Sequence, residues 1–188
     1  MTTLAIVQAR ISSSRLPGKV LLPLGGKPMV IYQLERLRRC QRLDRLVLAT
    51  SSHSSDDTLA DVVSAAGFAV FRGDLQDVLE RFRACVSVEQ PTTVVRLTGD
   101  CPLSDPALID ELIEAFGRGG WDYLSNSADA QQLSVPDGFD AEVFRADLLE
   151  RAALEAQLPL EREHVTPFFR TEKAGVRCGH FRHLPVRP

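Results

Sequence analysis

The sequence predicts an α/β fold of three layers, in which helices cover both faces of a mainly parallel central sheet. Two observations predict it. Short apolar segments alternate with helical segments along the 188 residues, and this alternation favours right-handed crossovers between parallel strands. Polar and charged loops follow several apolar segments, as expected where a ligand binds at the carboxyl edge of such a sheet. We expect one domain over residues 1–188, because this length suits a single hydrophobic core.

The predicted strands are short apolar runs bounded by polar or turn residues. They begin at Leu4 and continue with residues 45–50, 68–71, 93–97 and 121–124. Apolar runs of this length are typical of strands that are buried on both faces of a parallel sheet. Residues 136–144 form a further segment, and alternate side chains would share one face if this segment is extended.

Apolar residues recur at helical spacing in segments that are bounded by capping residues. These segments cover residues 28–40, 56–66, 75–88, 107–116, 146–156 and 160–170. Pro28 suits a first helical position, and Gly67 suits a C-cap after the second segment. Asp74 and Asp105 are predicted N-caps, because a carboxylate oxygen there accepts hydrogen bonds from free backbone N–H groups.

Composition excludes several classes of protein. Apolar runs of roughly 20 residues, which a membrane-spanning helix needs, are absent, and we find no secretion-signal pattern, so we expect a cytoplasmic protein. The four cysteines stand far apart, which disfavours a zinc site or a disulfide framework. A pI near 5.8 without a basic tail argues against nucleic-acid binding. A small anionic ligand fits better.

The loop after the first predicted strand gathers cations. Residues 1–34 contain Arg10, Arg15, Lys19 and Lys27 but no Asp or Glu, although the whole chain has a net charge of −3. Backbone amides near Gly18 and the hydroxyls of Ser12, Ser13 and Ser14 add hydrogen-bond donors to the same loop. Such a loop at the end of a strand favours a phosphate site, and a triphosphate more than a single carboxylate. The alternative is a solvated basic loop.

Two common phosphate-binding loops are excluded. In the P-loop pattern G-x-x-x-x-G-K-[ST], Ser13 stands where the first glycine belongs and Val20 stands where the Ser or Thr belongs. The dinucleotide pattern G-x-G-x-x-G is also absent. The loop therefore indicates another nucleotide-binding scheme.

Two acidic features follow predicted strands. Asp100 falls on the same sheet edge as the basic loop, which makes it a candidate Mg²⁺ ligand beside phosphates; the alternative is a turn residue. Asp140 and Glu142 share one face of residues 136–144 if these are extended. They are candidates for binding sugar hydroxyls or for helping a metal, and the alternative is a charge pair at a sheet edge. Residues 126–136 are polar and irregular, which suits a lid or an arm toward a second subunit.

Several segments together resemble one enzyme family. The first is Arg10-x-Ser12-Ser13-Ser14-Arg15-Leu16-Pro17-Gly18-Lys19, followed by Gly25-Gly26-Lys27-Pro28-Met29. The second is Arg96-Leu97-Thr98-Gly99-Asp100-Cys101-Pro102-Leu103. Supporting segments are residues 49–51, 56–57, 72–73, 77–82, 122–126, 137–144 and 162–167. This combination resembles the cytidylyltransferases that activate acidic sugars as CMP-sugars, and most of all the branch typified by spore coat polysaccharide biosynthesis protein F.

The resemblance implies a Rossmann-like nucleotide-diphospho-sugar transferase fold and an enzyme that transfers CMP from CTP to a sugar with release of pyrophosphate. It implies Arg10, Lys19 and Asp100 as catalytic residues, with Asp100 as the Mg²⁺ ligand. The nucleotide-binding residues that it implies are Gln8, Ala9, Arg10, Ser12, Ser13, Arg15, Gly18, Lys19, Thr98 and Gly99. The resemblance also favours a homodimer. Our own interpretation of the residues gives Asp140, Glu142, Arg162 and His164 as candidates for binding the sugar, and a structural role is the alternative for His164.

The chain departs from the family pattern at its C-terminal end. Relatives usually continue into a strand and a Val-Asp-x-Pro-Glu-Asp segment whose first Asp can be a second metal ligand, whereas this chain stops at Pro188. We therefore expect the two-carboxylate metal site of the family to be incomplete, unless Asp140 or Glu142 takes the place of the second ligand. Three alternatives stay open: another nucleoside triphosphate, a non-sugar alcohol as acceptor, and a nucleotide-binding module that has lost catalysis. The sequence does not identify the sugar.

Overall fold

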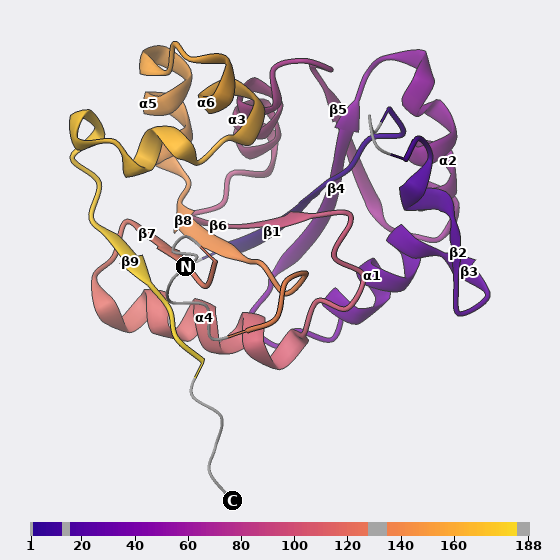
Figure 1. The fold of residues 1–188 in the computed structure, drawn as a ribbon, viewed down its shortest axis with the longest axis horizontal. Coiled ribbons are helices and arrows are strands. Elements are labelled where there is room, and N and C mark those ends of the chain that lie inside the picture. The colour runs from indigo at the N-terminus through magenta and orange to yellow at the C-terminus, as the bar shows by residue number, and fades with distance from the viewer. Residues whose placement is uncertain (1, 13–15, 128–134, 184–188) are drawn as a thin grey trace, which may run out of the picture.

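The structure is a computed structural model that describes residues 2–12, 16–127 and 135–183 (Figure 1). Its centre is a seven-stranded sheet with the order β5-β4-β1-β6-β8-β7-β9. The strands are β1 (Thr3–Gln8), β4 (Arg45–Ser51), β5 (Ala69–Gly73), β6 (Thr93–Thr98), β7 (Tyr123–Ser125), β8 (Glu142–Arg145) and β9 (Cys178–His180). Strand β8 runs antiparallel to its neighbours β6 and β7, and the other pairings are parallel. The predicted mainly parallel sheet is confirmed.

Helices cover both faces of this sheet (Figure 1). They are α1 (Met29–Leu37), α2 (Asp57–Ala65), α3 (Val78–Glu89), α4 (Pro106–Gly119), α5 (Asp147–Glu155) and α6 (Pro159–His164). Helices α1, α2 and α4 supply one apolar cluster, and α3 and α5 supply the other. Strand β1 lies between the clusters: Ala5 and Val7 pack into the first, while Leu4 and Ile6 pack into the second. Its unbroken apolar run therefore reflects burial on both faces.

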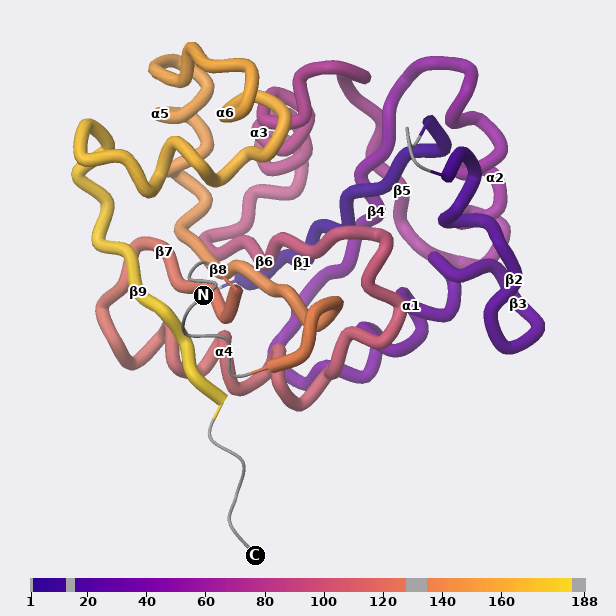
Figure 2. Tube along the Cα trace, viewed as in Figure 1, coloured from indigo at the N-terminus to yellow at the C-terminus, as the bar shows by residue number. Residues whose placement is uncertain are grey.

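Short elements complete the chain. A 3₁₀ turn, η1 (Lys19–Leu21), and a small hairpin of β2 (Pro23–Leu24) and β3 (Lys27–Pro28) lead into α1. Figure 2 shows this hairpin beside α1 and far from α5 and α6. Three further 3₁₀ turns are η2 (Ser54–Asp56), η3 (Pro167–Arg170) and η4 (Glu172–Ala174). Within the described ranges, no helix has the length and apolar character that a membrane crossing requires.

Two predicted helix boundaries are wrong. The helix predicted for residues 160–170 breaks at Val165, whose φ of 69° is left-handed, and Pro167 then begins η3 instead of continuing α6. Helix α3 begins at Val78 rather than at residue 75, and its N-cap is Asp77, which accepts a hydrogen bond from the Glu80 amide at 2.9 Å. The predicted cap Asp105 is confirmed, since it accepts from the Ala107 amide at 2.9 Å.

The carboxyl ends of β1 and β6 approach each other closely. The Gly99 amide donates to the Gln8 carbonyl at 2.8 Å. A Cβ atom on Gly99 would lie 2.7 Å from the Ala9 Cβ and 3.1 Å from the Gln8 carbonyl oxygen. Because only a glycine leaves this space free, the loops that follow the two strands start side by side. The same contact fixes the relative position of the residues described below.

We predict that Gly99→Ala lowers the free energy of unfolding by about 1–3 kcal/mol, because the added methyl group forces β1 and β6 apart. The matched control is Gly117→Ala within α4, where a Cβ would have no atom within 4 Å. That variant should gain about 0.5–1 kcal/mol from higher helix propensity. Urea unfolding of both variants measures the difference, and equal stabilities would contradict the close packing at Gly99.

Candidate functional site

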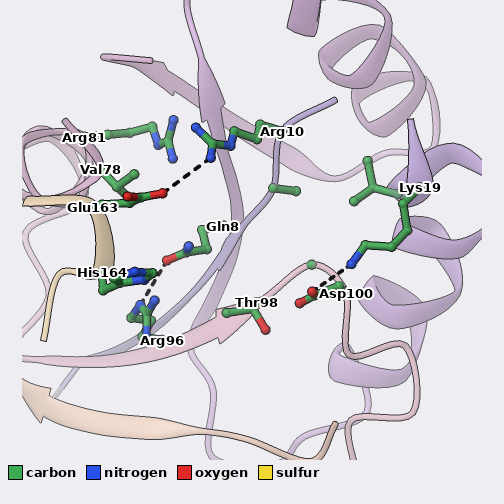
Figure 3. A pocket seen from close by; sticks show the side chains of 13 residues that line it. Gln8, Arg10, Lys19, Val78, Arg81, Arg96, Thr98, Asp100, Glu163 and His164 are labelled. Carbon is green, nitrogen blue, oxygen red and sulfur yellow. Dashed lines mark hydrogen bonds and ion pairs between the residues drawn. The ribbon is translucent and has the colours of Figure 1, made fainter. Parts of the chain in front are cut away.

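A pocket of about 310 Å³, which we call the first pocket, opens at the carboxyl edge of the sheet. It is lined by Gln8, Ala9, Arg10, Lys19, Val20, Val78, Arg81, Arg96, Thr98, Gly99, Asp100, Glu163 and His164 (Figure 3). These residues come from the ends of β1 and β6, from η1, from the start of α3 and from the end of α6. The pocket therefore lies where a parallel α/β sheet places its ligands.

A second pocket of about 260 Å³ adjoins the first. It is lined by Arg96, Thr98, Ser127, Asp140, Ala141, Glu142, His164, Thr166, Pro167 and Arg170. Arg96, Thr98 and His164 line both pockets, so they mark the junction between them. Two ligands that occupied the two pockets would thus meet at these three side chains.

Lys19 and Asp100 contact each other at one side of the first pocket. The Lys19 Nζ donates to Asp100 Oδ2 at 2.9 Å, and the Asp100 side chain is 42% exposed (Figure 3). Burial acts to raise the pKa of Asp100, but hydrogen bonds from Lys19 and Thr98 outweigh it, so this pKa lies below its usual value. The carboxylate is therefore charged at neutral pH and accessible from the pocket.

Two arginines stand at the other side of the same pocket. Figure 3 shows the guanidinium groups of Arg10 and Arg81 close to each other. Arg10 has one loose ion pair, with Glu163 at 3.6 Å. Arg81 is only 2% exposed; its Nη1 donates to the Asp74 carbonyl at 3.0 Å, and its buried Nε has no hydrogen-bond partner within the described chain. Burial lowers the pKa of Arg81, and the nearby Arg10 charge adds to this effect.

A buried network lies beneath the junction of the two pockets. Glu142 accepts hydrogen bonds from Arg96 Nη1, from the Tyr123 hydroxyl at 2.6 Å and from the Thr166 hydroxyl at 2.7 Å. Arg96 Nε also donates to Gln8 Oε1 at 2.9 Å. Burial alone would raise the pKa of Glu142, but the Arg96 charge and these donors hold it below its usual value.

Most residues predicted to bind the nucleotide come together. Gln8, Ala9, Arg10, Lys19, Thr98 and Gly99 line the first pocket, together with Asp100, the predicted metal ligand. Gly18 precedes η1 with a left-handed φ of 72°, and its amide donates to the Ile11 carbonyl, so it shapes the loop without lining the pocket. Ser12 is exposed and does not line the pocket. Ser13 and Arg15 lie outside the described residues.

The residues predicted for the sugar separate into two groups. Asp140, Glu142 and His164 line the second pocket. Burial and the charge of Asp137 raise the pKa of Asp140. Glu142, by contrast, has its oxygens occupied by the three donors described above.

Arg162 lines neither pocket. Its Nε donates to the Asp77 carboxylate at 2.9 Å and its Nη1 donates to the Ala153 carbonyl at 2.8 Å, so it ties α6 to the start of α3. Residues 128–134, the greater part of the predicted lid or arm at 126–136, lie outside the described residues. The lid and the dimer stay predictions.

Sequence reasoning assigned no role to three arginines that line the pockets, Arg81, Arg96 and Arg170. Arg81 and Arg96 belong to segments that carried the family resemblance, and that was the available signal. Arg170 carried no such signal. The sequence predicted it as the end of a helix over residues 160–170, whereas the structure places it in η3. Its side chain makes no hydrogen bond or ion pair with the described part of the chain.

A cationic pocket at the carboxyl edge of a mainly parallel sheet is typical of proteins that bind phosphorylated ligands. A family model described as cytidylyltransferase matches residues 4–187, and the chain belongs to the cytidylyltransferase family. The predicted family and the nucleotide-diphospho-sugar transferase fold are thereby confirmed. The chain is accordingly a nucleotidyltransferase.

Individual relatives agree with this assignment. Spore coat polysaccharide biosynthesis protein SpsF of Bacillus subtilis is 39% identical over 189 residues, which cover 98% of this chain and 76% of that protein. The 8-amino-3,8-dideoxy-manno-octulosonate cytidylyltransferase of Shewanella woodyi is 34% identical over 123 residues, or 63% of this chain and 49% of that protein. A solved cytidylyltransferase of Leptospira borgpetersenii has a TM-score of 0.89 at 31% identity, and covers 97% of this chain and 76% of that one.

The buried Glu142 predicts a dependence of stability on acid pH. Its folded-state pKa is below the unfolded value of about 4.3. Its contribution to the free energy of unfolding is thus complete above that pH and is lost as the pH falls through the folded-state pKa. We predict that Glu142→Gln costs about 3–5 kcal/mol at neutral pH, since it leaves the Arg96 charge unpaired, and that this cost shrinks toward pH 3.

Urea unfolding of the wild type and the variant between pH 3 and pH 7 measures this difference. Glu35→Gln is the control, because it breaks an exposed ion pair with Lys27, which should contribute about 0–1 kcal/mol. A cost of Glu142→Gln that is the same at every pH would contradict a folded-state pKa of Glu142 below its unfolded value.

Proposed function

We propose that this chain transfers CMP from CTP to a hydroxyl of an acidic sugar, releases pyrophosphate and uses Mg²⁺. The observation that carries the proposal is the charge of the first pocket. Four cations line it, Arg10, Lys19, Arg81 and Arg96, against the carboxylates Asp100 and Glu163. This excess of positive charge suits a triphosphate, whose oxygens accept several charge-assisted hydrogen bonds at once.

Asp100 is the residue proposed to hold Mg²⁺. Within the described chain, no group of three His, Cys, Asp or Glu side chains could hold a metal ion. Mg²⁺ usually takes one or two carboxylates and completes its shell with phosphate oxygens and water. One accessible, charged carboxylate on the pocket wall therefore fits an ion that arrives with the triphosphate. Such an ion would neutralise charge on the phosphates and on the leaving pyrophosphate.

The second pocket is proposed to bind the acceptor sugar. Asp140 can accept hydrogen bonds from sugar hydroxyls, and Arg170 supplies a cation that can pair with a carboxylate. The octulosonate in the name of the Shewanella woodyi relative is an acidic sugar, which supports the same substrate class.

In the proposed reaction, the attack comes from the second pocket and the leaving group departs into the first. A sugar hydroxyl attacks the α-phosphorus from the second pocket, a new P–O bond forms and the hydroxyl proton passes to solvent. The bond between the α-phosphorus and the pyrophosphate breaks, and the pyrophosphate leaves toward Lys19. Positioning and charge neutralisation are sufficient for this step, because phosphoryl-transfer reactions need no covalent nucleophile from the protein. The chain's own contribution is to fix both substrates and to surround the phosphates with cations.

Nucleotide binding tests the first part of the proposal. We expect CTP to bind more tightly than UTP, ATP or GTP, and Mg²⁺ to strengthen its binding. Lys19→Met should weaken CTP binding by about 10- to 100-fold, since it removes a charged hydrogen-bond donor. Asp100→Asn should abolish the effect of Mg²⁺. Lys27→Met is the matched control, because Lys27 pairs with Glu35 outside both pockets.

Isothermal titration calorimetry with each nucleotide, with and without Mg²⁺, gives these affinities. Pyrophosphate release is then measured with CTP and a panel of acidic sugars, each paired with a neutral sugar of similar size. Pyrophosphate release with acidic sugars but not with the neutral sugars supports the full proposal. Tight CTP binding with no release from any sugar would instead indicate a nucleotide-binding module, and a preference for another triphosphate would overturn the assignment of CTP.

A further inference from the structure

We propose that Arg96 binds the α-phosphate of the nucleotide at the junction of the two pockets, and that Glu142 positions Arg96 for this contact. The inference rests on the proposed function and adds to it a residue that directly contacts the reacting group. It also gives Glu142 a different role from the sugar contact predicted from the sequence.

The place of the attacked phosphorus follows from the two pockets. If the triphosphate lies among the cations of the first pocket and the sugar lies in the second, the α-phosphorus must sit where they meet. Only Arg96, Thr98 and His164 line both pockets in the described structure. Of these three side chains, Arg96 alone carries a permanent positive charge.

The hydrogen bonds of Arg96 leave one edge of its guanidinium group available. Nε donates to Gln8 Oε1 at 2.9 Å, and Nη1 donates to Glu142. Nη2 makes no hydrogen bond with the described part of the chain, and the whole side chain is 11% exposed. A guanidinium held on two sides loses little conformational freedom when a phosphate oxygen binds its third nitrogen.

Glu142 is suited to orient Arg96 and not to bind a ligand. Tyr123 on β7 and Thr166 between α6 and η3 both donate to its Oε1, while Arg96 on β6 donates to its Oε2. These partners hold the carboxylate in one position and occupy three of its roughly four lone-pair sites. A buried ion pair is by itself weak evidence for a contribution to stability. Arg96, the cation of this pair, lines both pockets, which favours a role of the pair in the site.

A fixed guanidinium at this position would act on the transfer step itself. During the transfer, negative charge is spread over the oxygens of the α-phosphate while the bond to pyrophosphate breaks. A donor that is already oriented toward those oxygens stabilises the charge without reorganisation. Arg96 would therefore contribute both to nucleotide binding and to the rate of transfer.

A series of cytidine ligands tests the assignment without knowledge of the sugar. Calorimetry of cytidine, CMP and CTP is compared for the wild type, Arg96→Lys and Arg96→Met. We expect both variants to bind CMP and CTP more weakly, by about 10- to 100-fold for Arg96→Met and less for Arg96→Lys, with cytidine unchanged. Lys19→Met provides the contrast: it should weaken CTP binding but leave CMP binding unchanged.

Glu142→Gln tests the positioning role. It should reproduce the loss of CMP affinity seen in Arg96→Met, again without an effect on cytidine. If Arg96→Met fails to fold because Glu142 is left unpaired, the double variant Arg96→Met/Glu142→Gln takes its place, since it removes both charges. Circular dichroism and thermal unfolding establish which variants are folded.

Each outcome separates the two proposals. If the wild type binds CTP and CMP but the Arg96 variants bind CMP equally well, the α-phosphate contact is wrong while the proposed function stands. If cytidine is weakened as much as CMP, Arg96 has a structural role only. If the wild type binds no cytidine nucleotide, the proposed function itself fails and this inference fails with it.

Discussion

The pairing of β1 with β6 is the constraint on which the site depends. Its parallel register places Gln8 opposite Thr98 and ends at Gly99, whose missing side chain lets the two following loops start in contact. One of these loops leads to Lys19 and the other begins with Asp100, so residues 81 positions apart meet at 2.9 Å. The basic loop and the acidic turn form one pocket because the strands that precede them are neighbours.

Carboxylates of the protein pair with three of the four cations that line this pocket. Lys19 pairs with Asp100, and Arg10 pairs loosely with Glu163. Exposed or half-exposed ion pairs of this kind contribute little stability, so phosphate oxygens can replace the carboxylates at small cost. Arg96 differs, because its partner Glu142 is buried and held by two further donors. In the first pocket, Arg10 and Lys19 thus have partners that a phosphate can replace, whereas Arg96 is held in place by Glu142.

Much of the site followed from the sequence, since strand order and charge segregation are local signals. The alternation of strands and helices placed the loops at 10–19 and 98–100 on one sheet edge, and the structure brings Arg10, Lys19 and Asp100 together there. The roles assigned to these residues stay predictions.

The remaining features depend on contacts between residues that are distant in the sequence. The position of Glu142 is set by Arg96, Tyr123 and Thr166, which no periodicity connects. Arg81 lies on a helix, where an arginine usually faces solvent, yet it is buried beside the pocket. Val165 adopts a left-handed conformation that β-branched residues rarely take, so local propensity did not predict the break that brings Arg170 to the second pocket.

The central claim is that a triphosphate lies in the first pocket with its α-phosphorus at the junction of the two pockets. A crystal structure of the chain with bound CTP tests it most directly. The account predicts the β- and γ-phosphates between Arg10 and Lys19, and an α-phosphate oxygen about 2.7–3.2 Å from Arg96 Nη2. A nucleotide bound elsewhere, or an α-phosphate remote from Arg96 and the second pocket, would contradict it.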